Sequence, residues 1–219
     1  MLVYKDAPLP KGGFIAAAQV KNLVVLHFTA GATASGALAQ WNSQLNYVST
    51  PYIVDLNGDV IRTYSEEFWS YHLGEASEDH RNHKRSIAVE IVNRGPLRAK
   101  YGSEQLFWWP NDFKTPYCFN RERDKYVTLP AAWHSEKFFA AFTQAQIDAV
   151  VELVVEICER RGIPKAIPPA RIRHTMDVSW YRNFKGVCSH VNFRADKTDL
   201  APGQSDAIWA GLLAKGFTE

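Results

Sequence analysis

Two histidines and an aspartate, far apart in the chain, are the residue types of an open zinc site. His27 ends an unbroken apolar run, 22–28 (NLVVLHF), and small residues follow it. His190 and Asp199 lie near the other end of the chain, in a region that Pro202 and Gly203 close. A catalytic zinc ion takes three protein ligands of these types and leaves a fourth position for water or substrate. We therefore predict one Zn²⁺ ion bound by the three residues, although His27 taken alone is better explained as a core histidine.

Glu90 and Lys197 supply groups that hydrolysis at such a site requires. Glu90 interrupts the apolar run 86–93 (SIAVEIVN), and Lys197 precedes Asp199 by two positions. A water that attacks a carbonyl needs a base to take its proton and an acid to return one to the leaving nitrogen, and a carboxylate can do both. A lysine can stabilise the oxyanion that forms. Without the histidines, Glu90 is better explained as a buried acid in an ion pair, and Lys197 as a solvated loop residue.

The patterns around these residues predict an α/β fold. The runs 22–28 and 86–93 are typical of central strands covered on both faces, so His27 would lie at the edge of a sheet and face a cleft. An Asn-Gly pair at 57–58 between two apolar-rich runs predicts a tight hairpin. Strands that alternate with helices indicate a single mixed central β-sheet flanked by helices.

Capping signals predict helices around this sheet. Thr33 or Ser35 can cap a first helix. Residues 143–146 (TQAQ) have the form of a capping box and precede an apolar stripe at helical spacing, which predicts a long helix. We expect a short strand over 170–174 and a last amphipathic helix from about Ser205.

The length and composition suit one domain over residues 1–219, with a Pro/Gly-rich arm over 1–20. The chain is 46% hydrophobic and 22% charged, with three widely spaced cysteines that indicate a reducing compartment. The formal charge is only +2 and no basic run occurs, which argues against a nucleic acid partner. No apolar stretch suits a signal peptide or a membrane span, so we expect synthesis in the cytoplasm.

An aromatic-rich insert over 95–136 lacks periodicity. Long structureless segments inside compact domains are frequently lids or binding loops, although the aromatic side chains are equally suited to anchoring the loop. Sugar rings and peptide methyl groups pack well on aromatic faces. We predict that Trp108 and Trp109 border a substrate groove.

Six motifs resemble those of the zinc-dependent N-acetylmuramoyl-L-alanine amidases, a family that includes phage endolysins and is related to peptidoglycan recognition proteins. The motifs follow one another in the family's order: 26–31 (LHFTAG) with the first metal ligand, 51–58 (PYIVDLNG) with the hairpin, 71–74 (YHLG) with a histidine of the substrate cleft, 86–93 with the catalytic glutamate, 142–146 (FTQAQ) at the start of the long helix, and 189–203 with the second histidine, the catalytic lysine and the third ligand.

The resemblance implies an amidase or peptidoglycan-recognition-like fold and hydrolysis of the amide bond between N-acetylmuramic acid and the L-alanine of the stem peptide. It implies one Zn²⁺ ion on His27, His190 and Asp199, with Glu90 and Lys197 as catalytic residues. The residues expected to contact substrate are His72, Tyr52, Asn93, Trp108 and Trp109.

His174 is a rival for the second metal ligand. Residues 173–178 (RHTMDV) resemble an Arg-His-x-Asp-Val motif of other family members, with one extra residue. We favour His190 because it lies much nearer to Asp199 in the sequence.

Three alternatives share these features. A non-catalytic peptidoglycan-binding module is one, but such relatives typically lack the ligands that this chain keeps. A zinc peptidase is another. An amidase would act either on the cell wall after release, as an endolysin does, or on soluble muropeptides recycled in the cytoplasm. In each case we expect a monomer whose partner is peptidoglycan or a muropeptide.

Overall fold

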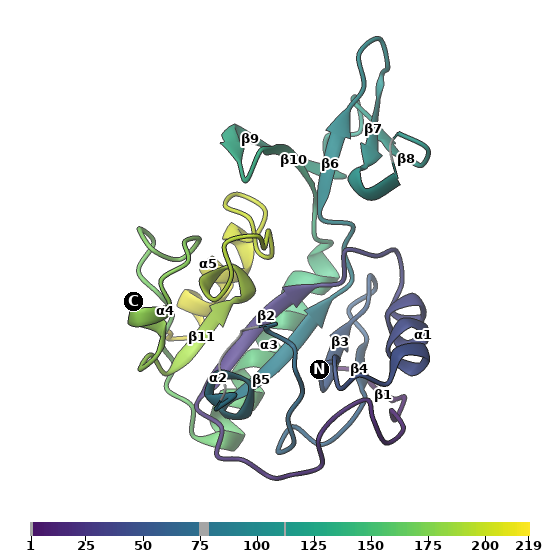
Figure 1. Cartoon of the computed structure of the whole chain (residues 1–219). Helices are drawn as coiled ribbons and strands as arrows, with labels where there is room; N and C mark the ends of the chain where they lie inside the picture. Colours follow the sequence, from purple (N-terminus) through teal and green to yellow (C-terminus); the bar gives the residue numbers. More distant parts are fainter. Residues whose placement is uncertain (1, 75–78, 112) are drawn as a thin grey trace.

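A six-stranded mixed sheet lies at the centre of the molecule (Figure 1). The computed structural model describes residues 2–74, 79–111 and 113–219. Across the sheet the strands are β1 (Tyr4–Asp6), β4 (Val60–Arg62), β3 (Tyr52–Val54), β5 (Ser86–Ile91), β2 (Leu23–Phe28) and β11 (Gly186–Ser189). β3 and β4 form the predicted antiparallel hairpin, whereas β2 pairs in parallel with both β5 and β11. The prediction of one mixed central sheet flanked by helices is confirmed.

Helices cover one face of this sheet. α3 (Gln144–Arg161) and α5 (Asp206–Ala214) pack against it, with β2 and β5 crossing in front of α3 in Figure 1. The predicted capping box of α3 is present: Thr143 Oγ1 accepts from the Gln146 N–H, and the Gln146 side chain accepts from the Thr143 N–H. α1 (Ala34–Gln44), capped by Thr33 as predicted, packs beside the hairpin.

The opposite face carries short elements and a smaller core. α2 (Arg81–Arg85) precedes β5, α4 (Val178–Tyr181) precedes β11, and the 3₁₀ turn η2 (His190–Asn192) follows β11. Because side chains alternate along a strand, Leu23, Val25 and His27 share this face, whereas Val24 and Leu26 enter the core under α3. His27 is therefore the polar member of an otherwise apolar row.

Residues 96–140 form a second, antiparallel sheet, so the prediction of a structureless insert is wrong. Across this sheet the strands are β8 (Pro116–Phe119), β7 (Gln105–Trp108), β6 (Pro96–Ala99), β10 (Glu136–Ala140) and β9 (Tyr126–Trp133), and η1 (Trp109–Asn111) follows β7. Register shifts interrupt the pairing of β7 with β8 and of β9 with β10. Such bulges break the two-residue alternation that a sequence pattern depends on, which explains why these strands were not predicted.

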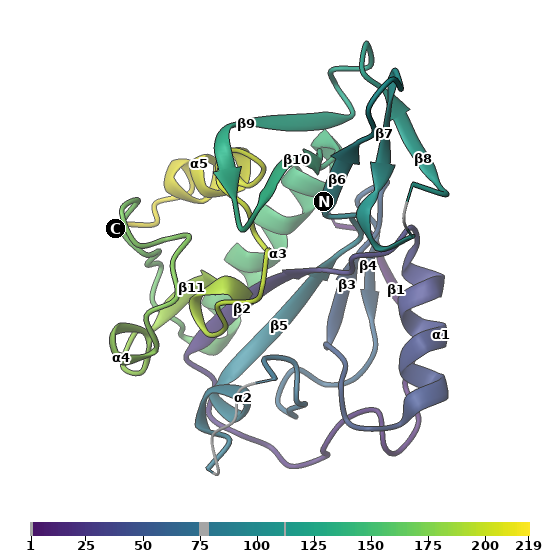
Figure 2. The ribbon, with the colours of Figure 1, turned by 45° about the horizontal axis from the view of Figure 1, so that its top comes forward.

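The insert is attached to the body beside the loop that contains Asp199. It lies above the carboxyl ends of the central strands, and β9 extends toward α5 (Figure 2). The Asn93 side-chain amide donates to the carbonyls of Ala140 and Ala141, 3.2 Å away in each case. β9 and β10 form a hairpin. Leu129 of β9 and Ala201 belong to one buried cluster, so the β9–β10 hairpin packs directly on the loop that follows Asp199.

Three smaller expectations have mixed outcomes. Residues 170–174 form turns and not a strand, because Ile172 and Arg173 both donate backbone hydrogen bonds back to the Pro169 carbonyl. α5 begins after Ser205, as predicted, and the three cysteines are buried and free. Among the residues described, none of the helices has the length and apolar character needed to cross a membrane.

Candidate active site

The parallel strands bring three polar residues to one edge of the sheet. His27 of β2 pairs with Glu90 of β5 in register, so their side chains lie side by side on one face. β11 pairs with β2 up to Ser189, opposite Leu26, and His190 follows immediately. The carboxyl ends of parallel strands meet at the same sheet edge, and this is why residues 163 positions apart become neighbours.

His27, His190 and Asp199, which we call the ligand cluster, direct three donor atoms at one point. His27 Nδ1 is 3.0 Å from His190 Nδ1, and Asp199 Oδ2 is 3.3 Å from the first nitrogen and 3.1 Å from the second. All three residues are buried, with exposed fractions of 3%, 6% and 6%. Among the residues described, this is the group of His, Cys, Asp or Glu side chains that converges as a metal site would.

The chemistry of the ligand cluster fits a zinc ion. Ligand atoms around a tetrahedral zinc ion lie about 3.3 Å apart, given bonds of about 2.0–2.1 Å. Burial and the adjacent His190 lower the pKa of His27 to about 4, so His27 is neutral near pH 7. Burial alone would raise the pKa of Asp199, but His190 and His27 hold it well below its usual range. A neutral imidazole and an ionised carboxylate are the forms that bind metal.

Glu90 lies beside the ligand cluster, and its carboxyl group has a raised pKa. Burial and the charge of Asp199 raise the pKa of Glu90 to about 8, against the opposing effect of Lys197. The same lysine contributes to the lowered pKa of His27, which shows that its charge lies near both residues. A carboxyl group whose pKa is close to neutral is suited to accept and return a proton.

The structure brings His190, and not His174, to His27. His174 Nδ1 lies 3.0 Å from the Leu200 carbonyl oxygen, and its ring faces Trp133 with centroids 6.5 Å apart. His174 is therefore outside the ligand cluster.

Tyr52 faces away from the site. It pairs in register with Val89, one position before Glu90, and a step of one residue along a strand places a side chain on the opposite face. Its hydroxyl donates to Glu66 Oε2 over 2.6 Å, in the core beneath α3. The expectation that Tyr52 contacts substrate is not supported by this position.

Asn93 and His72 also use their polar atoms within the protein. Besides its bonds to β10, Asn93 accepts from the Gly95 N–H and from the Gln204 amide, which makes it a structural link between the sheet and the insert. His72 Nδ1 lies 3.0 Å from His27 Nε2, so His72 is behind the ligand cluster and not on the wall of an open cleft. The 71–74 pattern indicated a histidine of the cleft but not this contact.

The two tryptophans differ in their surroundings. The Trp108 indole N–H donates to the Arg94 carbonyl, and the Arg94 guanidinium lies 4.3 Å from its ring centroid. Trp109 is 38% exposed and lines a pocket of about 330 Å³ together with Asp196 and Thr198, which flank Lys197. Trp109 is therefore the tryptophan next to the loop that contains Lys197.

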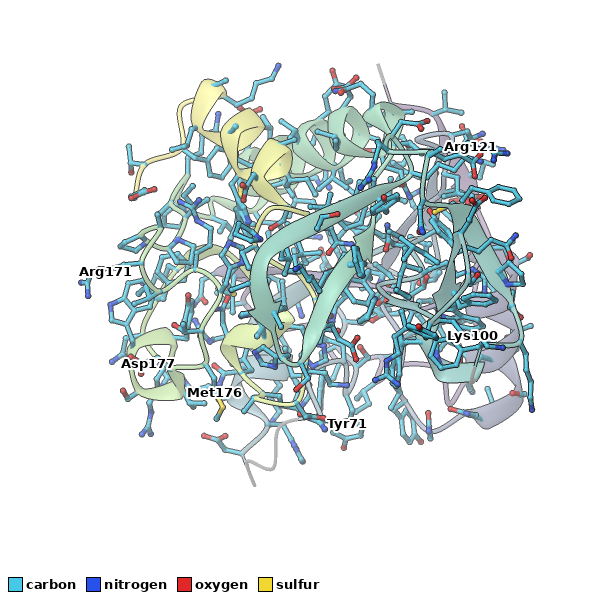
Figure 3. The ribbon with its side chains drawn as sticks, turned by 90° about the horizontal axis from the view of Figure 1, so that it is seen from above. Tyr71, Lys100, Arg121, Arg171, Met176 and Asp177 are labelled. Atoms are coloured by element: carbon cyan, nitrogen blue, oxygen red, sulfur yellow. The ribbon has the colours of Figure 1, made fainter. Side chains whose placement is uncertain are left out.

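The view from above shows the insert and the turns before β11 on two sides of the molecule. In Figure 3, Lys100 and Arg121 mark the insert on one side, and Arg171, Met176 and Asp177 mark the turns before β11 on the other. The β9–β10 hairpin lies between them. The insert thus extends over the end of the sheet at which His27 and Glu90 lie.

Comparisons with known proteins agree with this fold. A family model described as N-acetylmuramoyl-L-alanine amidase matches residues 17–203. A complex of the amidase AmiD from E. coli with anhydro-N-acetylmuramic acid-L-Ala-D-gamma-Glu-L-Lys is 22% identical, with a TM-score of 0.54 over 93% of this chain and 60% of that chain. A mutant endolysin from Bacillus subtilis is 13% identical, with a TM-score of 0.54 over 98% of both chains. PlyL is 14% identical, with a TM-score of 0.53 over 98% of this chain and 96% of its own. No curated protein sequence gives a significant match.

Proposed function

Because this chain belongs to the N-acetylmuramoyl-L-alanine amidase family, we propose that it hydrolyses the amide bond between N-acetylmuramic acid and the L-alanine of the peptidoglycan stem peptide, with one bound zinc ion. The observation that carries the proposal is the convergence of His27, His190 and Asp199 beside Glu90. A binding module has no need of a proton-transfer group next to three metal-type donors.

Each residue has a distinct task in this proposal. His27, His190 and Asp199 hold the zinc ion, which when bound supplies a more acidic water and polarises the substrate carbonyl. Glu90 takes a proton from the attacking water and returns one to the leaving nitrogen of L-alanine. Lys197 stabilises the negative charge that develops on the carbonyl oxygen.

We propose that the substrate is the polymeric cell wall, as for an endolysin, and that soluble muropeptides are the alternative. AmiD, with the same fold, was solved with a muropeptide, which supports a stem peptide as the group recognised. The insert favours the polymer, because it presents Trp109 beside the catalytic loop and so lengthens the surface available to a glycan strand.

Product analysis tests the reaction. Purified protein loaded with zinc should release stem peptides with a free L-alanine amino terminus from isolated sacculi. Cuts within the peptide would indicate a peptidase, and intact wall with bound protein would indicate a binding module. Digestion of soluble muropeptides without action on sacculi would exclude the endolysin role.

The role of the insert has its own test. Trp109→Ala should weaken binding to sacculi in a pull-down, with less effect on hydrolysis of a small muropeptide. Phe119→Ala is the matched control, because Phe119 is an equally exposed aromatic residue of the insert, at 37%, that does not line this pocket. If Trp109→Ala and Phe119→Ala bind sacculi as well as the parent protein, the insert is scaffold only.

A further inference from the structure

Two consecutive residues, His72 and Leu73, contact both histidines of the ligand cluster from behind. His72 Nδ1 lies 3.0 Å from His27 Nε2, and the Leu73 carbonyl oxygen lies 2.8 Å from His190 Nε2. In each histidine the contacted nitrogen is the one that does not face Asp199. The position of the imidazole proton on both rings therefore depends on these two contacts.

The contact between His190 and Leu73 permits only one direction of the hydrogen bond. A peptide carbonyl only accepts hydrogen bonds, so His190 Nε2 must carry the hydrogen and donate it to Leu73. In the neutral ring this leaves the lone pair on Nδ1. That atom is the one that points at His27 Nδ1 and Asp199 Oδ2.

The contact to His27 is fixed by a chain of hydrogen bonds. Ser86 Oγ lies 2.6 Å from the Asn82 carbonyl oxygen and 2.7 Å from His72 Nε2. Because the carbonyl has no hydrogen, the Ser86 hydroxyl donates to it, and the remaining bond requires that His72 Nε2–H donate to Ser86. His72 Nδ1 then carries a lone pair and accepts from His27 Nε2–H, which leaves His27 Nδ1 free to bind metal.

We propose that His72 is a positioning residue which, through Ser86 on one side and His27 on the other, holds His27 in the tautomer that binds zinc, while the Leu73 carbonyl does the same for His190. The inference rests on the proposed metal site. Partners behind metal-binding histidines commonly fix the tautomer and ring orientation in this way.

The segment that carries these contacts is built into the body of the protein. The Leu73 side chain is fully buried in a cluster with Leu23 and Val25, on the same sheet face as His27. Gly74 has φ +60°, a backbone conformation that favours glycine, so the chain turns directly after Leu73. A fixed position is what a hydrogen-bond partner for a ligand requires.

Zinc affinity tests the role of His72 without relying on activity. The metal-free full-length protein is titrated with zinc against a chelator. His72→Phe keeps an aromatic ring but removes the acceptor, and should weaken zinc binding about 10–100-fold. His72→Asn restores an acceptor close to the position of Nδ1 and should recover most of the affinity. An unchanged affinity in folded His72→Phe, or equal losses in the two variants, would overturn the proposal.

A second pair of variants keeps the test decisive if His72→Phe does not fold. Ser86→Ala removes the group that orients His72 and should weaken zinc binding about tenfold. Ser70→Ala is the matched control, because the buried Ser70 hydroxyl also donates to a main-chain carbonyl, that of Ser49, but has Tyr64 and not His72 as its other partner. Equal affinities in these two variants would contradict the role of Ser86.

The outcomes separate this inference from the proposed function. Parent protein that binds no zinc would defeat both. Parent protein that binds zinc, with variants that bind it equally well, would defeat only the inference about His72. Nitrogen NMR of the metal-free protein gives an independent readout: we expect the hydrogen of His27 on Nε2 in the parent and a mixture of tautomers in Ser86→Ala.

Discussion

Two polar clusters, each around a buried carboxylate, lie on opposite faces of the central sheet. In the Glu66 cluster (Glu66, Tyr52, Arg160 and Arg161), the carboxylate meets hydrogen-bond donors from the other three residues. In the ligand cluster two imidazole nitrogens and a carboxylate oxygen lie within 3.0–3.3 Å of one another, and the tautomers that we propose direct both nitrogen lone pairs to this point. The first arrangement is complete without any further group. The second offers three donor atoms to a cation.

This difference separates residues that stabilise the fold from residues that bind a ligand. A buried charge that is paired and hydrogen-bonded contributes to stability, and removal of one partner is costly. A set of converging donor atoms is completed when it binds a metal ion. Variants of the two clusters should therefore have opposite effects on activity and on stability.

The largest effect is expected at Asp199. Asp199→Asn should lose zinc and reduce turnover to background, because a three-ligand site rarely tolerates the loss of one ligand. The metal-free variant should keep most of the stability of the metal-free parent, since an amide N–H can donate to a histidine lone pair in place of the carboxylate contacts. Metal analysis, hydrolysis rates and thermal unfolding check this, and a metal-free variant that is clearly less stable would mean that Asp199 belongs to a structural cluster.

Glu90→Gln should separate metal binding from catalysis. Glutamine has nearly the shape of glutamate but cannot accept a proton near neutral pH, so zinc and substrate binding should persist. Turnover should fall about 10²–10⁴-fold, the usual contribution of a general acid-base group. The acidic limb of the rate profile should also disappear. Near-normal turnover with that limb intact would make Glu90 a structural acid.

Lys197→Ala should lower turnover about 10²–10³-fold, because an oxyanion loses one stabilising group. Unlike Glu90→Gln, it should keep the acidic limb of the rate profile. Lys185→Ala, at an exposed lysine, is the control for a loss of positive charge. If both lysine variants hydrolyse muropeptide at the parent rate, the oxyanion must be stabilised by another group.

Glu66→Gln should have the smallest effect on turnover and a clear effect on stability. Burial alone would raise the pKa of Glu66, but hydrogen bonds from Arg160, Tyr52 and Arg161 lower it to about 2, below the ordinary 4.5. A lowered carboxyl pKa stabilises the protein above the unfolded pKa, and this contribution is lost as the pH falls from 4.5 toward 2.

The shift sets an upper limit of about 3 kcal/mol on this contribution at neutral pH, and solvent around the exposed Arg160 side chain reduces it. The difference in unfolding free energy between parent and Glu66→Gln should therefore shrink as urea denaturation is repeated at lower pH. A difference that is independent of pH would show that the ion pairs are not its source.

The sequence predicted the part of the site that depends on regular strands. His27 and Glu90 follow buried apolar runs, and such runs become central parallel strands whose carboxyl ends meet. Tyr52 was expected to contact substrate but lies on the other face of the sheet, because a step of one residue along a strand exchanges the two faces. The contact of His72 with His27 could not be predicted, since it depends on the path of a loop. The strands of the insert were not predicted, because bulges interrupt their alternation of apolar and polar residues.

The choice between His190 and His174 tests the central claim most directly, because both histidines fit a family motif but only His190 lies in the ligand cluster. Zinc content should be measured by mass spectrometry for the parent, His190→Ala and His174→Ala after equilibration with limiting zinc. We predict one ion per chain in the parent and in His174→Ala, and none in His190→Ala. Zinc retained without His190 and lost without His174 would contradict the account.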